Sequence, residues 1–223
     1  MLGKVPWAAA WSLDFWGSPL TDAFSHASFR PFATLSYVIE LWMRGIPRGR
    51  VATAAQLRSV SFSLHALNTS LVWFIVAALL PKHTVARVLA AALFAVHPVQ
   101  TDVLCNVANR CELLSAAFAL ASLLCTLQAA KRGAALHAGV LVSVSTLATC
   151  SVLSKETGAT ILLVNTLAAA TLAWCRKGRR ACLQHATAYT GVALAVAAAR
   201  LAWQQARVPR FLPSDNILVG LQQ

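Results

Sequence analysis

The stretch LDFWGSPLTDAFSHASFRP (13–31) brings Asp14 and Asp22 close in sequence to His26 and Arg30. A carboxylate can act as a general base that removes the proton of a hydroxyl group, and a nearby cation can stabilise a negatively charged leaving group. These residue types therefore allow group transfer to a hydroxyl. The alternative is an amphipathic segment that only anchors the chain at a membrane surface, in which Asp14 is a helix cap or a loop residue.

The same mixture of acids and bases recurs in two later segments, HPVQTDVLCNVANRCE (97–112) and SKETG (154–158). The candidate residues are His97, Asp102, Arg110, Glu112, Lys155 and Glu156. Cations of this kind can hold a phosphate group, and neighbouring glutamates can orient them. Each residue also has a structural alternative, because the cations can serve only in ion pairs, the histidine can end a helix, and the aspartate can belong to a turn.

The composition limits the setting in which this chemistry would occur. Of the 223 residues, 58% are apolar and only 12% are charged, and the mean hydropathy is +0.63. These values predict an all-α, multi-pass membrane protein rather than an ordinary soluble domain. The net charge of +12 could indicate nucleic-acid binding, but the basic residues fall between apolar runs, as in the cytosolic loops of membrane proteins. We therefore expect no nucleic-acid partner.

Apolar runs of about 20 residues, the length that spans a bilayer, begin after residue 56. They lie near 59–80, 113–130, 134–153, 159–175 and 183–203. A shorter run, 85–96, spans only if it tilts or if Arg87 reaches back to the head groups. With it, the sequence predicts about six spans. On the first of them His65 and Asn68 share a helix face, which is typical of interhelical hydrogen bonds.

The loops between these runs fall into two chemical classes. PKHTVAR (81–87), KRG (131–133) and RKGRR (176–180) are basic and contain no acid, and all 7 carboxylates lie in or beside the alternate segments. The positive-inside rule places the basic loops in the cytosol and the alternate segments in the lumen or outside the cell. We expect a large first lumenal or interfacial loop (1–56), a transmembrane domain (57–203) and a lumenal tail (204–223).

Two functions use acids and cations at a membrane surface. A transporter would place charges in mid-helix and often contains internal repeats, whereas these charges lie at helix ends and no repeat is visible. A glycosyltransferase with a lipid-linked donor would use a carboxylate base and cations for the phosphate, and we favour this function. The 6 cysteines form no zinc-type grouping, so no metal is expected. Cys105 and Cys111 could form a lumenal disulfide or be free packing residues.

Seven short motifs occur along the chain in a characteristic order. They are DFWGSP (14–19), SHASFRP (25–31), HALN (65–68), FAVHPVQTD (94–102), NRCELL (109–114), LSKETG (153–158) and FLPSDN (211–216). In this order they resemble the transmembrane and tetratricopeptide-repeat (TMTC) family of GT-C type protein O-mannosyltransferases. The resemblance implies an enzyme of the endoplasmic reticulum membrane. It would transfer mannose from dolichyl-phosphate mannose to Ser or Thr of secretory proteins, including cadherin-like domains, without a further cofactor.

The resemblance also assigns roles to individual residues. Asp14 matches the acidic residue of the first loop that GT-C enzymes use as catalytic base, although Leu13 stands where a polar residue is usual. Four residues would bind the donor phosphate: Arg30, His97, Arg110 and Lys155. Four others would support them: His26, Asp102, Glu112 and Glu156. Family members have a further helix before the DFWG loop, and more helices and repeats after the SDN motif, so the resemblance implies an N-terminal fragment of a longer protein.

Overall fold

The computed structural model describes residues 7–22, 25–26, 28–46 and 52–204, and every regular element among them is a helix. The predicted all-α class is therefore confirmed. The chain divides into two compact units, which are residues Met1–Val51 together with Arg200–Gln223 (unit 1) and Ala52–Ala199 (unit 2). Residues 205–223 of the predicted tail, which include the motif FLPSDN, lie outside the described residues.

Unit 1 contains a short 3-10 helix, η2 (Trp7–Trp11), an irregular loop and helix α1 (Pro31–Met43). Proline occupies the first position of α1, where its fixed φ suits the helix and its missing N–H costs no hydrogen bond. In the loop, Leu13 forms an isolated antiparallel bridge with Pro19. This bridge folds the segment that contains Asp14 back on itself.

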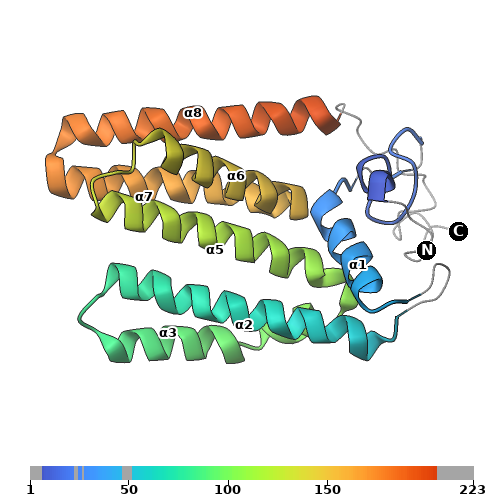
Figure 1. Ribbon diagram of the computed structural model, residues 1–223. Helices are drawn as coiled ribbons and strands as arrows, with labels where there is room; N and C mark the ends of the chain where they lie inside the picture. The colour runs from blue at the N-terminus through green and yellow to red at the C-terminus, as the bar shows by residue number, and fades with distance from the viewer. Residues whose placement is uncertain (1–6, 23–24, 27, 47–51, 205–223) are drawn as a thin grey trace, which may run out of the picture. The chain divides into compact units, whose positions relative to one another are not determined.

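Unit 2 is a helical bundle (Figure 1). Its elements in chain order are α2 (Ala54–Leu79), α3 (Thr84–Val96), α4 (Val99–Cys105), η3 (Val107–Asn109), α5 (Arg110–Lys131), α6 (Ala138–Ser154), η4 (Glu156–Ala159), α7 (Thr160–Lys177) and α8 (Arg179–Gln204), whose last turn is counted with unit 1. Each predicted apolar run overlaps one of the longer helices. The hydropathy pattern thus locates these longer helices correctly, whereas α4, which lies in a segment expected to be a loop, was not predicted.

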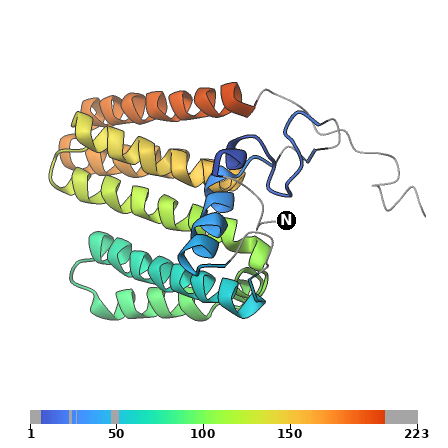
Figure 2. The same cartoon turned by 45° about the vertical axis from the view of Figure 1, so that its right-hand side comes forward.

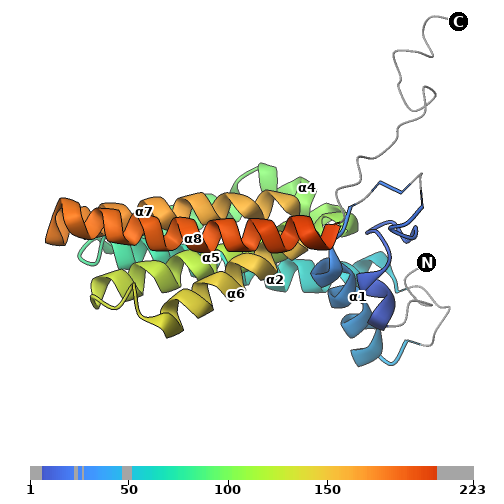
Figure 3. The same cartoon turned by 90° about the horizontal axis from the view of Figure 1, so that it is seen from above.

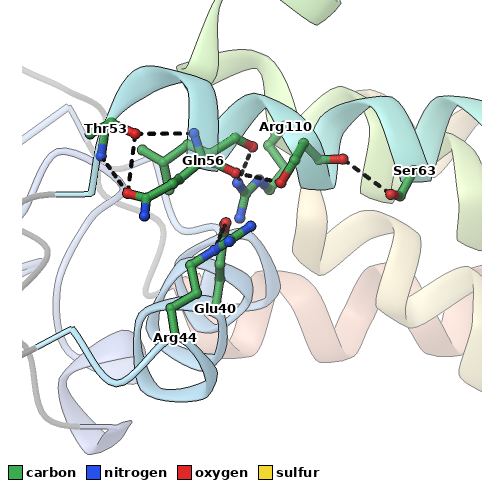
Figure 4. A network of polar contacts seen from close by, with 8 residues as sticks. Glu40, Arg44, Thr53, Gln56, Ser63 and Arg110 are labelled. Atoms are coloured by element: carbon green, nitrogen blue, oxygen red, sulfur yellow. Dashed lines mark hydrogen bonds and ion pairs between the residues drawn. The ribbon is translucent and has the colours of Figure 1, made fainter.

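Helix α2 begins at a capping box. The Thr53 side chain accepts a hydrogen bond from the Gln56 N–H at 3.3 Å, and Gln56 Oε1 accepts one from the Thr53 N–H at 2.9 Å (Figure 4). These reciprocal bonds satisfy two backbone groups that the first helical turn would leave without partners. From this start the helix continues for 26 residues, which is long enough to cross a bilayer.

Successive helices of unit 2 reverse direction, so the loops gather at two ends (Figures 1 and 2). The α2–α3, α5–α6 and α7–α8 connections lie together at one end, which we call the basic end (80–83, 131–137 and 176–180). The α3–α4 break and the α6–α7 connection lie at the other, which we call the mixed-charge end (97–112 and 154–158); Figure 3 also places α4 there. The basic loops that alternate along the sequence are therefore segregated in space as well.

Polar side chains join the helices inside unit 2. His65 Nε2 donates a hydrogen bond to the carbonyl oxygen of Ala95 at 3.0 Å, which connects α2 to α3. Asn68 Nδ2 donates to the carbonyl oxygen of Leu113 at 3.0 Å, which connects α2 to α5. The predicted interhelical role of His65 and Asn68 is therefore confirmed. Such bonds hold helices together where lipid on the outside removes the hydrophobic driving force between them.

Three helical segments are long and apolar enough to cross a membrane: Ala54–Leu79, Val107–Lys131 and Glu156–Lys177. The pair α3 and α4 forms a fourth if it counts as one span, although it bends by 54°. Pro98 lies at this bend, and a proline disfavours helical backbone in the residue before it. Helix α6 is apolar but shorter. The part of the chain that the structure describes thus has three or four candidate spans by length and composition.

Candidate functional site

Asp14 lies in unit 1 with a side chain that is only 2% exposed. Its Oδ1 accepts hydrogen bonds from Trp16 N at 3.0 Å and Ser18 N at 2.8 Å, and its Oδ2 accepts one from Ser25 Oγ at 2.7 Å. The sequence DFWGS favours this turn, because aspartate binds backbone N–H groups shortly after it and Gly17 tolerates a φ of 92°. The carboxylate therefore organises the loop in which it lies.

Arg30 belongs to the same folded loop as Asp14. Its guanidinium carbon lies 5.4 Å from the centroid of the Phe15 ring, which is a cation–π contact. Phe15 follows Asp14 directly, and its backbone N–H donates to the carbonyl oxygen of Ser28 at 2.8 Å. The acid and the cation are thus connected through one aromatic residue and one backbone bond. His26, the remaining predicted site residue of this stretch, is exposed.

Lys155 and Glu112 form an ion pair at the mixed-charge end of unit 2, between Lys155 Nζ and Glu112 Oε1. Glu112 lies in the first turn of α5, whereas Lys155 follows the last residue of α6 with an extended backbone (φ −157°, ψ 146°). The side chains of Lys155 and Glu112 are 20% and 37% exposed. The pair therefore fixes a cation close to the surface of the unit, where an anionic ligand has access to it.

Arg110 is the first residue of α5, and its side chain is fully buried. Its Nη2 donates a hydrogen bond of 2.7 Å to the carbonyl oxygen of Leu57, in the first turn of α2 (Figure 4). A buried guanidinium must have its hydrogen-bonding capacity satisfied, and this contact uses part of that capacity. Arg110 thus links the two helix ends that form one side of the mixed-charge end.

The other predicted residues of unit 2 have local hydrogen bonds or lie at helix ends. His97, in the break between α3 and α4, accepts a hydrogen bond at Nδ1 from Val99 N at 3.2 Å. Asp102 Oδ2 accepts one from Asn109 Nδ2 at 2.9 Å. Glu156 lies in the first turn of η4, where a negative charge suits the helix N-terminus. All three predicted residues are exposed, so these contacts leave part of each side chain accessible.

The structure sorts the predicted site residues into two groups. Unit 1 holds Asp14, His26 and Arg30, and unit 2 holds His97, Asp102, Arg110, Glu112, Lys155 and Glu156. Each group combines acids with bases. Within the second group, the Lys155–Glu112 pair links two predicted residues that are far apart in sequence.

Three residues that position this site were not predicted from the sequence. Ser25 holds the Asp14 carboxylate, Asn109 holds Asp102, and the Leu57 carbonyl receives Arg110. Ser25 is the first residue of the motif SHASFRP, and Asn109 is the first residue of NRCELL. Their positions in these two motifs are the sequence feature that could have identified them. A backbone carbonyl such as that of Leu57 gives no signal in a sequence, because its role depends on how two helices pack.

The structure also bears on two expectations from the sequence, which concern metal binding and a disulfide between Cys105 and Cys111. Among the described residues, no group of His, Cys, Asp or Glu side chains is arranged so that it could hold a metal ion. All six cysteines lie in the described ranges and are free, including Cys105 and Cys111. Cys105 is exposed and Cys111 is buried.

Comparison with known proteins gives several relatives that are named as protein O-mannosyl-transferases. The chain is 36% identical over 168 residues to protein O-mannosyl-transferase Tmtc2 of Drosophila melanogaster, an alignment that covers 73% of this chain and 17% of that protein. It is 33% identical over 162 residues to Tmtc1 of the same species, covering 73% and 18%. It is 30% identical over 167 residues to TMTC2 of Homo sapiens, covering 74% and 19%.

The match is limited to a small part of each relative. The aligned region spans less than a fifth of the length of these three proteins. No family model matches the chain, and no solved structure matches it.

Proposed function

Because the chain is homologous to part of the TMTC family of protein O-mannosyl-transferases, we propose that it acts in the transfer of mannose to proteins. The proposed donor is dolichyl-phosphate mannose, and the proposed acceptors are Ser and Thr hydroxyls of secretory-pathway proteins, including cadherin-like domains. The single observation that carries the proposal is the 36% identity over 168 residues to a relative named for protein O-mannosyl transfer.

In the proposed reaction Asp14 is the general base. The acceptor oxygen attacks the anomeric carbon of mannose while its proton passes to the Asp14 carboxylate. The bond between that carbon and the phosphate oxygen breaks, dolichyl phosphate leaves with the electron pair, and the anomeric centre is inverted. Two backbone N–H groups and Ser25 Oγ hold the carboxylate in one orientation, which supports this role because a fixed base loses less entropy in the reaction.

The proposed role of the cations is to stabilise the departing phosphate. Arg30, Arg110 and Lys155 would neutralise the charge that develops on it, and His97 would donate a further hydrogen bond. Glu112 supports this assignment for Lys155, since the ion pair holds the ammonium group in place. His26, Asp102 and Glu156 would complete the polar surroundings.

The proposed setting is the endoplasmic reticulum membrane. We propose six spans, made by α2, the α3–α4 pair, α5, α6, α7 and α8, with residues 1–56 as a lumenal loop and 204–223 as a lumenal tail. In this topology the basic end of unit 2 faces the cytosol and the mixed-charge end faces the lumen. The separation of the basic loops from all 7 carboxylates in the sequence supports this arrangement.

A second candidate function is that of a membrane protein that keeps the scaffold without catalysis, as a partner subunit or a transporter. The observation that favours it is the structural use of Asp14, which is 2% exposed and accepts three hydrogen bonds from described residues of its own loop. A base that touches an acceptor hydroxyl would need this loop to open when substrate binds.

An in vitro transfer assay distinguishes the two functions. Microsomes that contain the protein are supplied with radiolabelled dolichyl-phosphate mannose and a cadherin-like acceptor domain, and label in the acceptor is measured. The enzyme is expected to transfer label, and Asp14→Asn is expected to abolish transfer because the amide cannot accept the proton. The matched control is Ser25→Ala, which removes one hydrogen bond and leaves the base.

Each outcome decides between the candidates. Loss of transfer in Asp14→Asn with substantial transfer in Ser25→Ala supports the catalytic proposal. Undiminished transfer in Asp14→Asn removes Asp14 from the role of base. Complete absence of transfer by the unaltered protein, in membranes where a known transferase is active, supports the non-catalytic scaffold.

A further inference from the structure

The basic end of unit 2 concentrates positive charge in connections whose own sequences contain no acid. The exposed cations of its α5–α6 and α7–α8 connections are Lys131, Arg132, Arg176, Lys177, Arg179 and Arg180. The sequence has no Asp or Glu between Glu112 and Glu156 or between Glu156 and Asp215. Like charges that gather in this way repel one another unless an anion binds among them.

One of these cations has a structural role that brings the two connections together. Arg176 Nη1, near the end of α7, donates hydrogen bonds to the carbonyl oxygens of Ala130 at 3.0 Å and Lys131 at 2.8 Å. These carbonyls belong to the last turn of α5, which a helix leaves without intrahelical partners. Arg176 therefore caps α5 and holds the end of α7 beside it.

A second cation, Lys177, also comes close to the α5–α6 connection. Lys177 Nζ lies 3.9 Å from the position that a Cβ atom would occupy on Gly133, in the loop that follows Lys131 and Arg132. Gly133 has a φ of 72°, a conformation that glycine adopts without strain and that lets the chain turn directly after α5. The ammonium group of Lys177 thus lies against the α5–α6 connection.

The position of this cluster at the ends of two candidate membrane spans indicates which kind of anion it binds. Two candidate membrane spans, Val107–Lys131 and Glu156–Lys177, end at Lys131 and Lys177. The cations therefore lie where the apolar helices leave the bilayer, at the level of the lipid head groups. Trp174, one turn before the end of α7, is 56% exposed, and tryptophan favours this interface. Apolar helices directly below a basic cluster fit a phospholipid better than a soluble polyanion.

We infer that the cluster of Lys131, Arg132, Lys177 and Arg179 binds the phosphate of an anionic phospholipid at the leaflet that faces the basic end. The acyl chains of the lipid would lie along α7, where Leu163 and Leu167 are exposed, and Trp174 would contact its interfacial region. Arg176 is a positioning residue in this site, because it holds the two connections together. This site is separate from the mixed-charge end, and the inference does not depend on mannosyl transfer.

The test measures lipid binding to the purified chain in a neutral detergent by native mass spectrometry. The probes are phosphatidylserine and phosphatidylcholine with identical acyl chains, and phosphatidylinositol 4-phosphate to show whether a phosphate monoester binds better. Phosphatidylserine should bind more tightly than phosphatidylcholine. Because each surface cation contributes about a fivefold change in affinity for anionic lipid, K131Q/K177Q should weaken phosphatidylserine binding about 25-fold, and K131R/K177R should preserve it.

Single substitutions provide a matched control on the same end of the bundle. Lys177→Gln and Lys82→Gln each remove one positive charge from an exposed residue, but Lys82 lies in the α2–α3 connection. Lys177→Gln should weaken phosphatidylserine binding about fivefold, and Lys82→Gln should have a clearly smaller effect. Equal binding of the two lipids, or equal effects of the two substitutions, would overturn the proposed site. Displacement of the lipid by an RNA oligonucleotide at similar concentration would overturn the choice of ligand.

Discussion

The Lys155 ammonium group is paired with the Glu112 carboxylate, which lies 43 residues earlier in the chain. The pair joins the end of α6 to the first turn of α5 at the mixed-charge end of unit 2. Both side chains are partly exposed, and ion pairs in such positions contribute at most about 1 kcal/mol to stability. The pair is therefore better suited to orienting a cation than to holding the fold together.

This relationship predicts different effects of neutralising the two partners. Lys155→Gln removes the cation proposed to stabilise the phosphate and should lower mannosyl transfer about 100-fold, as for the loss of one transition-state donor. Glu112→Gln keeps the cation and removes only the charge of the partner that orients it, so it should lower transfer less. The free energy of unfolding of each variant should differ from that of the unaltered protein by at most about 1 kcal/mol. Equal losses of transfer in the two variants would assign the effect to the pair and not to the cation.

The Asp14 loop gives a second prediction, which concerns local stability. Asp14→Ala removes the acceptor of the Trp16 and Ser18 N–H groups, and bonds to a charged acceptor contribute about 1.5–3 kcal/mol each. Hydrogen exchange of these two amides should therefore accelerate at least about tenfold. Ser25→Ala removes the bond to Oδ2 and keeps the carboxylate that accepts from the two amides, so it should accelerate their exchange less. Unchanged exchange in Asp14→Ala would show that the loop does not depend on the carboxylate.

The helices of unit 2 could be predicted from the sequence because their cause is local. An apolar run of sufficient length between polar loops is enough to place a helix, and the predicted runs overlap α2, α3, α5, α6, α7 and α8. The same reasoning found the shared face of His65 and Asn68, since a spacing of three residues determines it. The short helix α1 was not predicted, because the prediction depended on apolar runs long enough to span a bilayer and α1 has only 13 residues.

The contacts between helices could not be predicted in the same way. The sequence suggested that Glu112 and Glu156 support the cations Arg110 and Lys155 but did not show which acid meets which cation. The structure pairs Glu112 with Lys155. Which residues meet depends on the rotation of each helix about its axis and on the direction in which the chain leaves it. The extended backbone of Lys155 (φ −157°, ψ 146°) decides that direction, and a single sequence gives no information about it.

A third prediction concerns the interior chain of hydrogen bonds that joins three helices. Asn165 Nδ2 of α7 donates to Ser122 Oγ of α5 at 2.8 Å, and Ser122 Oγ donates to the carbonyl oxygen of Val144 of α6 at 3.3 Å. Ser122→Ala leaves the amide donor of Asn165 without this acceptor, while Asn165→Leu leaves Ser122 bonded to Val144. Ser122→Ala should therefore lower the free energy of unfolding by about 1 kcal/mol more than Asn165→Leu does, as measured by thermal unfolding.

The double variant provides the control for this prediction. Ser122→Ala combined with Asn165→Leu removes both polar partners, and replacing both by apolar groups can be nearly neutral. Its free energy of unfolding should therefore lie closer to that of the unaltered protein than that of Ser122→Ala alone. Strict additivity of the two single effects would contradict a direct interaction between the side chains.

The fourth prediction concerns a close approach of backbones at Gly158. A Cβ atom on Gly158 would lie 2.4 Å from Ser151 Oγ, 2.6 Å from Ser115 Oγ and 2.6 Å from the carbonyl carbon of Ser151. The last of these belongs to the backbone of α6, which cannot rotate away as a side chain can. Gly158→Ala should therefore destabilise the protein by about 1–3 kcal/mol through overpacking.

Gly191 is the matched control for this substitution. It lies in α8, and a Cβ atom there would meet nothing within 4 Å. Gly191→Ala should stabilise the protein by about 0.5–1 kcal/mol, because alanine has the higher helix propensity. Thermal unfolding of the two variants in the same detergent compares them directly. A neutral Gly158→Ala would show that α6 and η4 can separate without cost.

The fifth prediction tests the orientation of unit 2 in the membrane with its own cysteines. Cys105 is an exposed thiol in α4 at the mixed-charge end, and Cys175 is an exposed thiol in the last turn of α7, near the basic end. In the proposed topology Cys105 is lumenal and Cys175 is cytosolic. A membrane-impermeant maleimide added to sealed microsomes should therefore label a variant that keeps only Cys175. It should label the Cys105-only variant only after the membrane is permeabilised.

A Cys111-only variant is the control, because this buried thiol should react slowly in both conditions. The proposed topology places three crossings, α5, α6 and α7, between Cys105 and Cys175. Labelling of both cysteines from the same side of the membrane would contradict this odd number. It would also show that the basic end and the mixed-charge end do not face opposite sides.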